Sequence, residues 1–275
     1  MVVALKKHWI VLQKTSFWST AQRYLELLAV LIPQNLHTRY RGSFLGVYWS
    51  LLNPLTMTGL YTAIFGATFA SYYGDSIINY TLAAFTGLLI TNFFSGSTSQ
   101  ALGSIVANGS LLNKIRLPLP VFPLTMIGVN VFQFLVGSFP LLAIVTLVNS
   151  QNIFYVPLLL LPFFALVLVC TGVGLLMSAL YVFFRDLGYF YEIATFIVWI
   201  TSPVFYPAEI VPENIQPFLH LNPLVPIIEN LREISLQSTI PSVESFVRSF
   251  LGGIIILAFG WFFFQRCKSA FIDLL

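Results

Sequence analysis

The sequence predicts an all-α integral membrane protein with six transmembrane helices. Of its 275 residues, 57% are hydrophobic and only 8% are charged, whereas soluble domains carry about 25% charged residues. Asp75 is the one charged residue between Gly42 and Asn113, and none occurs between Leu117 and Phe184. A bilayer core takes roughly 20 apolar residues per helix, so each of these two blocks is long enough for two crossings.

Residues 1–42 are expected to form a cytoplasmic N-terminus with an amphipathic interfacial helix over residues 20–37. Apolar residues recur there at three- and four-residue steps, with polar residues on the opposite face. A helix of this kind lies in the membrane interface and does not cross the bilayer. Pro33 is expected to kink or end the helix, because proline removes a backbone donor.

A transmembrane domain is expected over residues 43–265. Polar or charged breaks divide it at Asp75, at residues 107–118, at residues 149–152 and at residues 185–186. The expected spans cover residues 44–70, 78–104, 121–148, 155–181, 188–206 and 247–264.

Residues 207–245 lie between the fifth and sixth expected spans and contain six prolines and five acids. This segment is too polar and too interrupted to cross the bilayer, yet too apolar for a free tail. We expect an outer re-entrant helical hairpin, which needs protein or a water-filled cavity to satisfy its backbone. Glu229 and Arg232 are spaced to pair on one helix turn. Both a structural pair and an outer gate fit this spacing.

The distribution of charge orients the chain in the membrane. With six spans, one side carries eleven of the thirteen lysine and arginine residues, while the other carries Arg232, Arg248 and six acids. An excess of lysine and arginine marks the cytoplasmic face. Both termini, including the tail at residues 266–275, are therefore expected in the cytoplasm.

Several kinds of chemistry are missing from the sequence. The middle of each expected span lacks acids, lysines and arginines, which are the usual carriers of proton or sodium coupling. No phosphate-binding loop of the Gly-x-x-x-x-Gly-Lys-Ser/Thr type occurs, so active transport would need a separate ATPase. The two cysteines and three histidines have no metal-ligand spacing. We expect no catalytic residue and no metal site, and the net charge of +3 gives no reason to expect nucleic-acid binding.

An aromatic stripe marks the first expected span. Tyr61, Phe65, Phe69 and Tyr72 recur at steps of four, four and three residues, which places them on one helix face. Because aromatic faces stack on sugar rings, the stripe is a candidate lining for a substrate channel. Helix packing and an aromatic belt at the outer membrane interface fit the same spacing.

Two basic groups on the expected cytoplasmic side are candidates for contact with a partner subunit. They are Arg39 with Arg41, and Lys114 with Arg116. The same residues also fit a simpler role, which is to fix orientation against anionic lipid.

The stretch RYRGSFLGVYWSLLNP, from Arg39 to Pro54, resembles the opening signature of polysaccharide-export ABC transporter permeases. The resemblance covers about residues 20–265. Three further motifs follow in the order of that family: LLNKIRLP at 111–118, FRDL at 184–187 with SPVFY at 202–206, and NPL at 222–224 with Glu229 and Arg232.

The resemblance implies a homodimeric permease with two cytoplasmic ATP-binding subunits in a bacterial inner membrane. Its substrate would be a lipid-linked polysaccharide, such as the O-antigen of lipopolysaccharide, a capsule polymer or a teichoic acid. ATP and Mg would sit on the partner, with no cofactor in this chain. The interfacial helix and the loop of Lys114 and Arg116 would meet the ATPase, and the hairpin would line the outer exit. A polymer-wide path is also more easily enclosed between two copies than within six helices.

Three other functions are compatible with parts of the sequence. An ABC permease for a small drug or lipid would share the fold. A membrane-embedded enzyme acting on lipid-linked sugars would need a converging polar cluster, for which Glu209, Glu213 and His220 are the candidates. A passive channel would need no ATPase.

Overall fold

The computed structural model describes residues 17–112 and 117–271, and all regular structure in these ranges is helical. This confirms the all-α class. The second, third, fourth and sixth expected spans each coincide with a long helical stretch, and most of their ends agree within a few residues. Four helical stretches in the described residues are long and apolar enough to cross a membrane: Ile77–Ala107, Val121–Ser150, Tyr155–Phe183 and Val243–Ala270.

Up to residue 200 the chain forms the following elements: α1 (Phe17–Tyr40), η2 (Gly46–Tyr48), α2 (Trp49–Phe69), η3 (Ala70–Tyr73), α3 (Ile77–Ala107), α4 (Gly109–Leu112), α5 (Val121–Gln133), η4 (Phe134–Ser138), α6 (Phe139–Ser150), α7 (Tyr155–Leu158), α8 (Leu160–Phe183) and α9 (Leu187–Ile200). The remainder comprises η5 (Ala208–Ile210), α10 (Gln216–Leu221), α11 (Val225–Arg232), η6 (Glu233–Gln237), α12 (Val243–Cys267) and η7 (Lys268–Ala270). The elements η4 and η6 are single π-helical turns.

Helices α2 and α9 correspond to the first and fifth expected spans, and both are shorter than expected. α2 has 21 residues, but Asn53, Pro54 and its threonines lower its hydropathy. α9 has 14 residues and ends at Ile200, so the expectation of a helix to residue 206 is wrong. Pro203 disfavours helical backbone at the residue before it, and the chain breaks there into turns.

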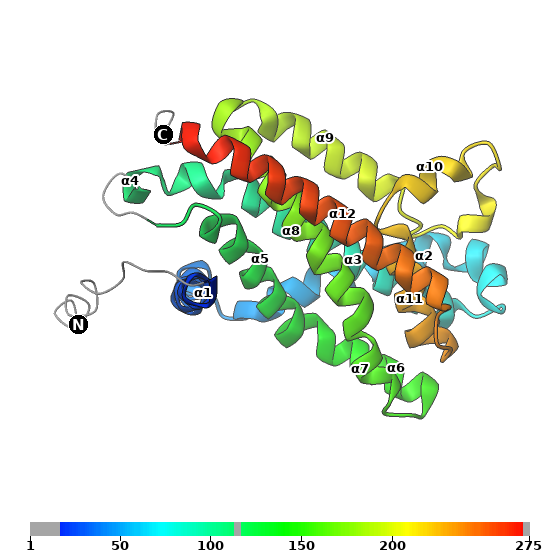
Figure 1. The fold of residues 1–275 in the computed structure, drawn as a ribbon. Coiled ribbons are helices and arrows are strands. Elements are labelled where there is room, and N and C mark those ends of the chain that lie inside the picture. Colours follow the sequence, from blue (N-terminus) through cyan, green and yellow to red (C-terminus); the bar gives the residue numbers. More distant parts are fainter. Residues whose placement is uncertain (1–16, 113–116, 272–275) are drawn as a thin grey trace.

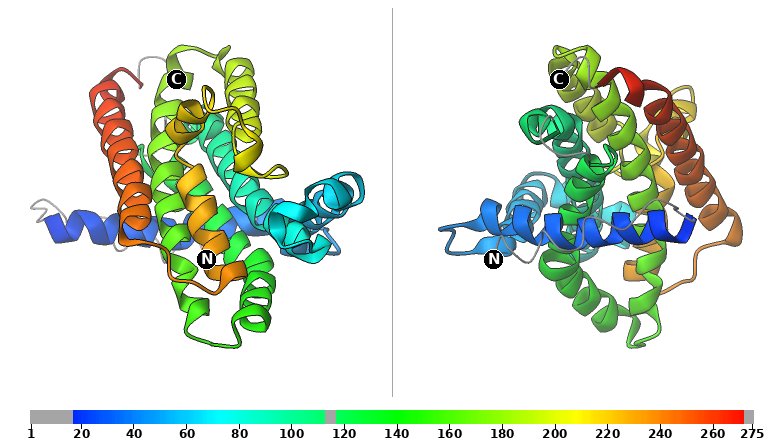
Figure 2. Two further views of the ribbon diagram at one scale, coloured as in Figure 1. Left: turned by 90° about the vertical axis from the view of Figure 1, so that its right-hand side faces the viewer. Right: turned by 60° about the vertical axis from the view of Figure 1, so that its left-hand side comes forward.

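Helix α1 runs across the direction of the long helices (Figure 2). Pro33 was expected to kink or end this helix. The helix does not end there, because it continues to Tyr40. Pro33 and Ala29, whose carbonyl loses its helical donor, are both on the exposed side. Polar surroundings can therefore satisfy that carbonyl. α1 then ends in a turn with Gly42 at φ +79°, a left-handed conformation that favours glycine.

Helices α3 and α8 form the centre of the bundle. Of the most apolar window of α3, 67% is buried, against 17% for α12, so α12 leaves most of its surface for lipid or a partner. Phe93 of α3, Phe134 of η4 and Phe163 of α8 meet in the main core, where the last two rings stack at 4.2 Å. Figure 1 places α4, the start of α9 and the end of α12 at one end of the bundle, and η3 and α10 at the other.

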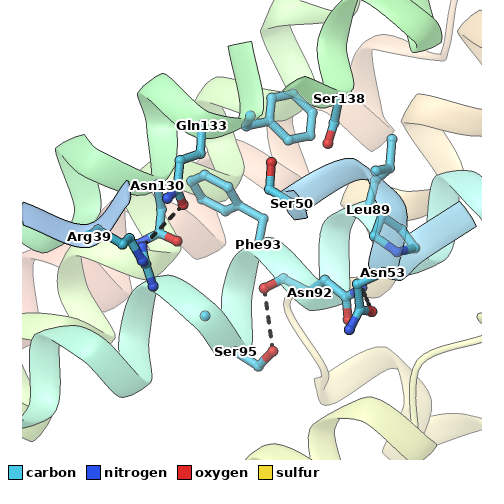
Figure 3. A pocket seen from close by; sticks show the side chains of 13 residues that line it. Arg39, Ser50, Asn53, Leu89, Asn92, Phe93, Ser95, Asn130, Gln133 and Ser138 are labelled. Atoms are coloured by element: carbon cyan, nitrogen blue, oxygen red, sulfur yellow. Dashed lines mark hydrogen bonds between the residues drawn. The ribbon is translucent and has the colours of Figure 1, made fainter. Parts of the chain in front are cut away.

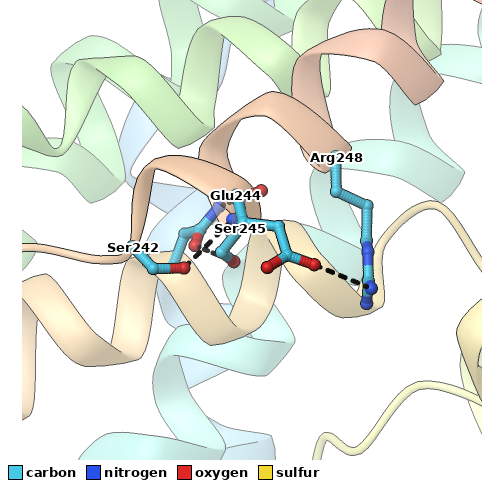
Figure 4. Close-up of polar contacts among 5 residues, drawn as sticks. Ser242, Glu244, Ser245 and Arg248 are labelled. Carbon is cyan, nitrogen blue, oxygen red and sulfur yellow. Dashed lines mark hydrogen bonds and ion pairs between the residues drawn. The ribbon is translucent and has the colours of Figure 1, made fainter.

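Polar contacts fix the start of α12 beside α11 (Figure 4). The Ser242 hydroxyl caps α12 by accepting a hydrogen bond from the Ser245 amide at 3.2 Å, and the Ser245 hydroxyl donates to Asn230 Oδ1 at 2.5 Å. Glu244 and Arg248 form an exposed ion pair at 3.8 Å. A pair this exposed contributes little to stability, so the cap and the Asn230 contact set this junction.

Helices α8 and α12 approach so closely that their backbones touch at glycines. A methyl group added at Gly172 would lie 2.5 Å from the Ile256 carbonyl, and one added at Gly260 would collide with the Gly172 carbonyl. Small residues permit this approach, which gives the van der Waals contact that drives helix association in lipid. The sequence alone did not indicate this pairing.

We expect Gly260→Ala to destabilise the bundle by about 1–3 kcal/mol, because overpacking forces the two helices apart. Gly252→Ala is the matched control, since nothing lies within 4 Å of an added methyl group there. Thermal unfolding of both variants in detergent measures the difference. Equal melting temperatures for the two variants would show that the α8–α12 contact is not tight.

Candidate functional site

The aromatic stripe on α2 forms a continuous row of neighbouring rings. The ring centroids are 6.4 Å apart for Tyr61 and Phe65, 5.9 Å for Phe65 and Phe69, and 6.4 Å for Phe69 and Tyr72. The spacing in the sequence therefore does place these side chains along one face. Their row leads from the middle of α2 to η3, at the end of the bundle that also holds α10 (Figure 1). We call this end the outer end, and residues 207–245 the outer segment, after the orientation expected from the charge distribution.

The row continues onto the segment that follows α9. Phe205 stacks on Tyr61 at 5.3 Å and on Phe65 at 5.9 Å, and Trp199 lies 5.6 Å from Phe205. We call the joined set the aromatic cluster. It comprises Tyr61, Phe65, Phe69, Tyr72, Tyr80, Phe196, Trp199, Phe205 and Tyr206.

Sequence reasoning missed the contribution of the α9 end to this cluster. The motif SPVFY was noted, but nothing in it reveals that Phe205 turns back against α2. Members of the cluster differ in exposure: Tyr80 is buried, whereas Tyr72 and Phe196 are more than half exposed. The cluster thus has a packed side that joins α2 to α9 and an open side that could contact a ligand.

A cavity of about 310 Å³ borders the aromatic cluster between α3 and α9. Glu192, Thr195 and Trp199 of α9 line it opposite Thr91 of α3. A carboxylate and hydroxyl groups beside an indole ring provide both hydrogen-bonding and stacking partners for a polyhydroxylated molecule. Sequence reasoning did not single out Glu192, which lies near the start of the fifth expected span.

Arg232 is partly buried and ties three parts of the outer end together. Its Nε and Nη2 groups donate to the Ala83 carbonyl of α3 at 3.1 and 2.8 Å. Nη2 also donates to the carbonyls of Pro203 at 2.7 Å and Val204 at 3.2 Å, beyond α9. The Arg232 side chain thereby bonds α11 to both α3 and the turn after α9.

The backbone around Arg232 is shaped to admit it. A methyl group at Gly87 would lie 3.0 Å from Val204 Cα and 3.2 Å from Arg232 Nη2. Burial lowers the pKa of the Arg232 guanidinium, while the charges of nearby groups, including Glu229, act in the opposite direction. The spacing of Glu229 and Arg232 thus brings the two side chains into electrostatic contact, with backbone carbonyls as the close partners of the guanidinium.

Tyr72, Glu229 and Arg232 line one cavity of about 190 Å³ at the outer end, together with Tyr73 and Glu209. Burial raises the pKa of the Tyr73 phenol. The structure therefore brings the outer end of the aromatic stripe next to the two residues expected at an outer gate. Nothing in the sequence indicated that these two groups share a cavity.

Asn222 makes a second link between the outer segment and α9. Its amide donates to the Ser202 hydroxyl at 3.0 Å and to the Thr201 hydroxyl at 3.1 Å. Its Oδ1 accepts from the Leu224 amide at 2.9 Å, which shapes the turn into α11. The NPL motif is thus a structural junction between two outer elements.

The basic residues expected at a partner contact have different surroundings. Arg41 lies exposed in the turn after α1. Arg39 is bonded through Nη1 to the side-chain oxygens of Gln100 at 3.1 Å and Gln133 at 3.3 Å. Lys114 and Arg116 lie outside the described residues. Within residues 17–112 and 117–271, no group of His, Cys, Asp and Glu side chains is arranged to hold a metal ion.

Comparison with known proteins gives one consistent family. Residues 26–236 match the model of the ABC-2 type transporter family. The O-antigen export system permease protein RfbA of Klebsiella pneumoniae is 28% identical over 255 residues, covering 91% of this chain and 95% of the relative. The capsule polysaccharide export inner-membrane protein CtrC of Neisseria meningitidis serogroup B is 26% identical, covering 90% of this chain and 94% of the relative. The polysialic acid transport protein KpsM of Escherichia coli is 25% identical over 74% of this chain and 78% of its own length.

We expect Arg232→Gln to destabilise the outer segment by roughly 2–4 kcal/mol, because it removes charged hydrogen bonds and leaves buried carbonyls without donors. Arg248→Gln is the control, since that side chain is exposed and pairs only with Glu244 at 3.8 Å. Limited proteolysis of residues 207–242 and the melting temperature in detergent report the change. Equal protection in both variants would contradict the role given to Arg232.

Proposed function

The chain belongs to the ABC-2 type transporter family, and on this basis we propose that it is the membrane permease of an ATP-driven polysaccharide exporter. The relatives that match at least 90% of this chain carry names that refer to O-antigen or capsule polysaccharide export. This agreement among relatives matched over most of their length is the observation that carries the proposal. The cargo is a lipid-linked glycan, moved outward across the bacterial inner membrane.

The energy comes from a separate subunit. This chain has no phosphate-binding loop, so ATP and Mg bind to a cytoplasmic partner. Arg41, Lys114 and Arg116 are proposed to face that partner, whereas Arg39 is bonded to Gln100 and Gln133 within the bundle. The exposure of Arg41 supports this assignment. Binding of ATP would displace α1 and the adjoining loop, and this movement would be transmitted to the spans.

Six crossings account best for the arrangement of the helices. α2 and α9 join the four longest apolar stretches, and the outer segment at 207–245 folds back against α3, α8 and α12. Arg185, Arg266 and Lys268 then lie at the inner end, and Glu209 at the outer end, as the excess of basic residues on the cytoplasmic face requires. Both termini would be cytoplasmic.

Two copies of the chain are proposed to enclose the path. Within one copy the apolar side chains of α3 and α8 close the centre of the bundle, as the main core shows. The exposed sides of α2 and α9 carry the open side of the aromatic cluster. Pairing of two such faces about a twofold axis would place the aromatic rings along a shared channel. Stacking on flat rings requires no particular sugar and permits sliding.

We expect the tagged chain to copurify with an ATP-hydrolysing subunit from its native cell, and Arg116→Glu to reduce the amount recovered at least severalfold. The reversed charge would repel an acidic partner surface. Arg248→Glu at the outer end is the matched control. Uphill movement of glycan by vesicles that contain this chain alone would overturn the need for a partner.

Replacing Tyr61, Phe65 and Phe69 together by leucine is expected to slow glycan export severalfold while the protein still folds. Leucine keeps the apolar volume but removes the flat stacking surface. The control changes three exposed aromatic residues elsewhere, Phe164, Phe259 and Phe262, to leucine. Surface glycan per unit of membrane-inserted permease is the measurement. Full export by the first variant would assign the stripe to helix packing.

A further inference from the structure

A partly open cavity of about 380 Å³ lies where α1, α2, α3 and η4 meet. Figure 3 shows Arg39, Asn130 and Gln133 on one side of it and Asn53 with Asn92 on the other. The volume is within the range of about 300–1,000 Å³ that is typical of small-molecule sites. The functions argued above do not use this cavity.

The polar lining of this cavity is unusual for helices in lipid. Side chains such as asparagine and glutamine are costly in hydrocarbon unless they find partners. Some of them do pair across helices, as in the bond from Asn92 Nδ2 to Asn53 Oδ1 at 3.3 Å. Such pairs can simply join helices. Joining two helices, however, would not by itself require an open cavity lined by an arginine.

Arg39 is held at the cavity wall by neutral groups. Its Nη1 donates to Gln100 and Gln133, while Gln100 Oε1 also accepts from Asn130 Nδ2 at 3.0 Å. Gln133 is itself oriented by its bond to the Tyr40 hydroxyl. None of the described residues that line the cavity is acidic. The guanidinium therefore presents a positive charge that no carboxylate neutralises there.

The π-helical turn η4 contributes to the shape of the cavity. Gln133 and Ser138 are five residues apart and both line it. In an α-helix this spacing would direct the two side chains to different faces, whereas i→i+5 bonding in a π-turn brings them together. Leu89, Phe93 and Phe134 complete an apolar wall.

We propose that this cavity binds the phosphate or diphosphate group of the lipid-linked glycan as the substrate enters from the inner side of the membrane. Arginine suits phosphate because its planar donors bond two oxygens at once. Amide and hydroxyl groups on α2, α3 and η4 provide neutral hydrogen bonds, and the apolar wall accepts the first part of the lipid chain. The lipid-linked character of the ligand rests on the proposed function, whereas the preference for phosphate rests on the cavity.

The test measures binding of a long-chain polyprenyl diphosphate to the purified full chain in nanodiscs. Arg39→Gln is expected to weaken binding about tenfold or more, the effect of losing hydrogen bonds to a charged group. Arg41→Gln, two residues away and exposed, is the control and should change binding less than twofold. Melting temperatures of both variants show that they are folded, and Gln133→Leu gives an independent perturbation of the site.

Three competitors identify the source of the ligand. Unphosphorylated polyprenol, inorganic diphosphate and phosphatidylglycerol vesicles should each compete at least tenfold less well than the polyprenyl diphosphate. Equal competition by phosphatidylglycerol would assign the cavity to bulk lipid, and equal competition by diphosphate would assign it to free phosphate. Either result would overturn the proposal, as would equal binding by the Arg39 and Arg41 variants. Binding that depends on Arg39 in a protein that exports no glycan would refute only the exporter function.

Discussion

Hydrocarbon offers no hydrogen-bond partners, so every polar group buried in this bundle must find its partners within the protein. Many buried serine and threonine hydroxyls of the described residues bond to a carbonyl of their own helix, whereas a few longer polar side chains join different elements. The Arg232 guanidinium bonds the carbonyls of α3 and of the turn after α9. Asn222 bonds the same turn, and Asn230 accepts from Ser245 at the start of α12. These contacts hold the irregular outer segment against the spans.

The same constraint explains why the middle of the bundle and its outer end are held together differently. Close backbone contact at Gly172 and Gly260 joins α8 to α12 without any polar group. The outer end, where the backbone leaves the helix, depends instead on side-chain hydrogen bonds. Backbone packing therefore joins the central helices, and polar side chains join the outer segment to them.

Two features of opposite chemistry lie along one side of the bundle. The aromatic cluster runs from the middle of α2 to the cavity that contains Tyr72 and Arg232. The polar cavity at Arg39 lies at the other end of α2. A charged headgroup and an uncharged sugar chain need different surfaces, and α2 carries one at each end. This arrangement fits the proposed substrate, in which a phosphate group joins a lipid to a long glycan.

Residue composition and spacing were enough to predict the membrane class, most helix boundaries and the sharing of one face by Tyr61, Phe65 and Phe69. These follow from local composition and helical periodicity, which act over short distances along the chain. The sequence alone could not determine that Phe205 stacks on Tyr61, that Arg232 bonds Ala83, or that Arg39 turns toward Gln100 and Gln133. Each of these contacts joins residues far apart in the chain. The end of α9 at Ile200 and the continuation of α1 through Pro33 also depended on surroundings. The packing of the helices sets which polar groups meet. In lipid a buried donor must bond an acceptor of the protein, and the tertiary structure determines which acceptor lies within reach.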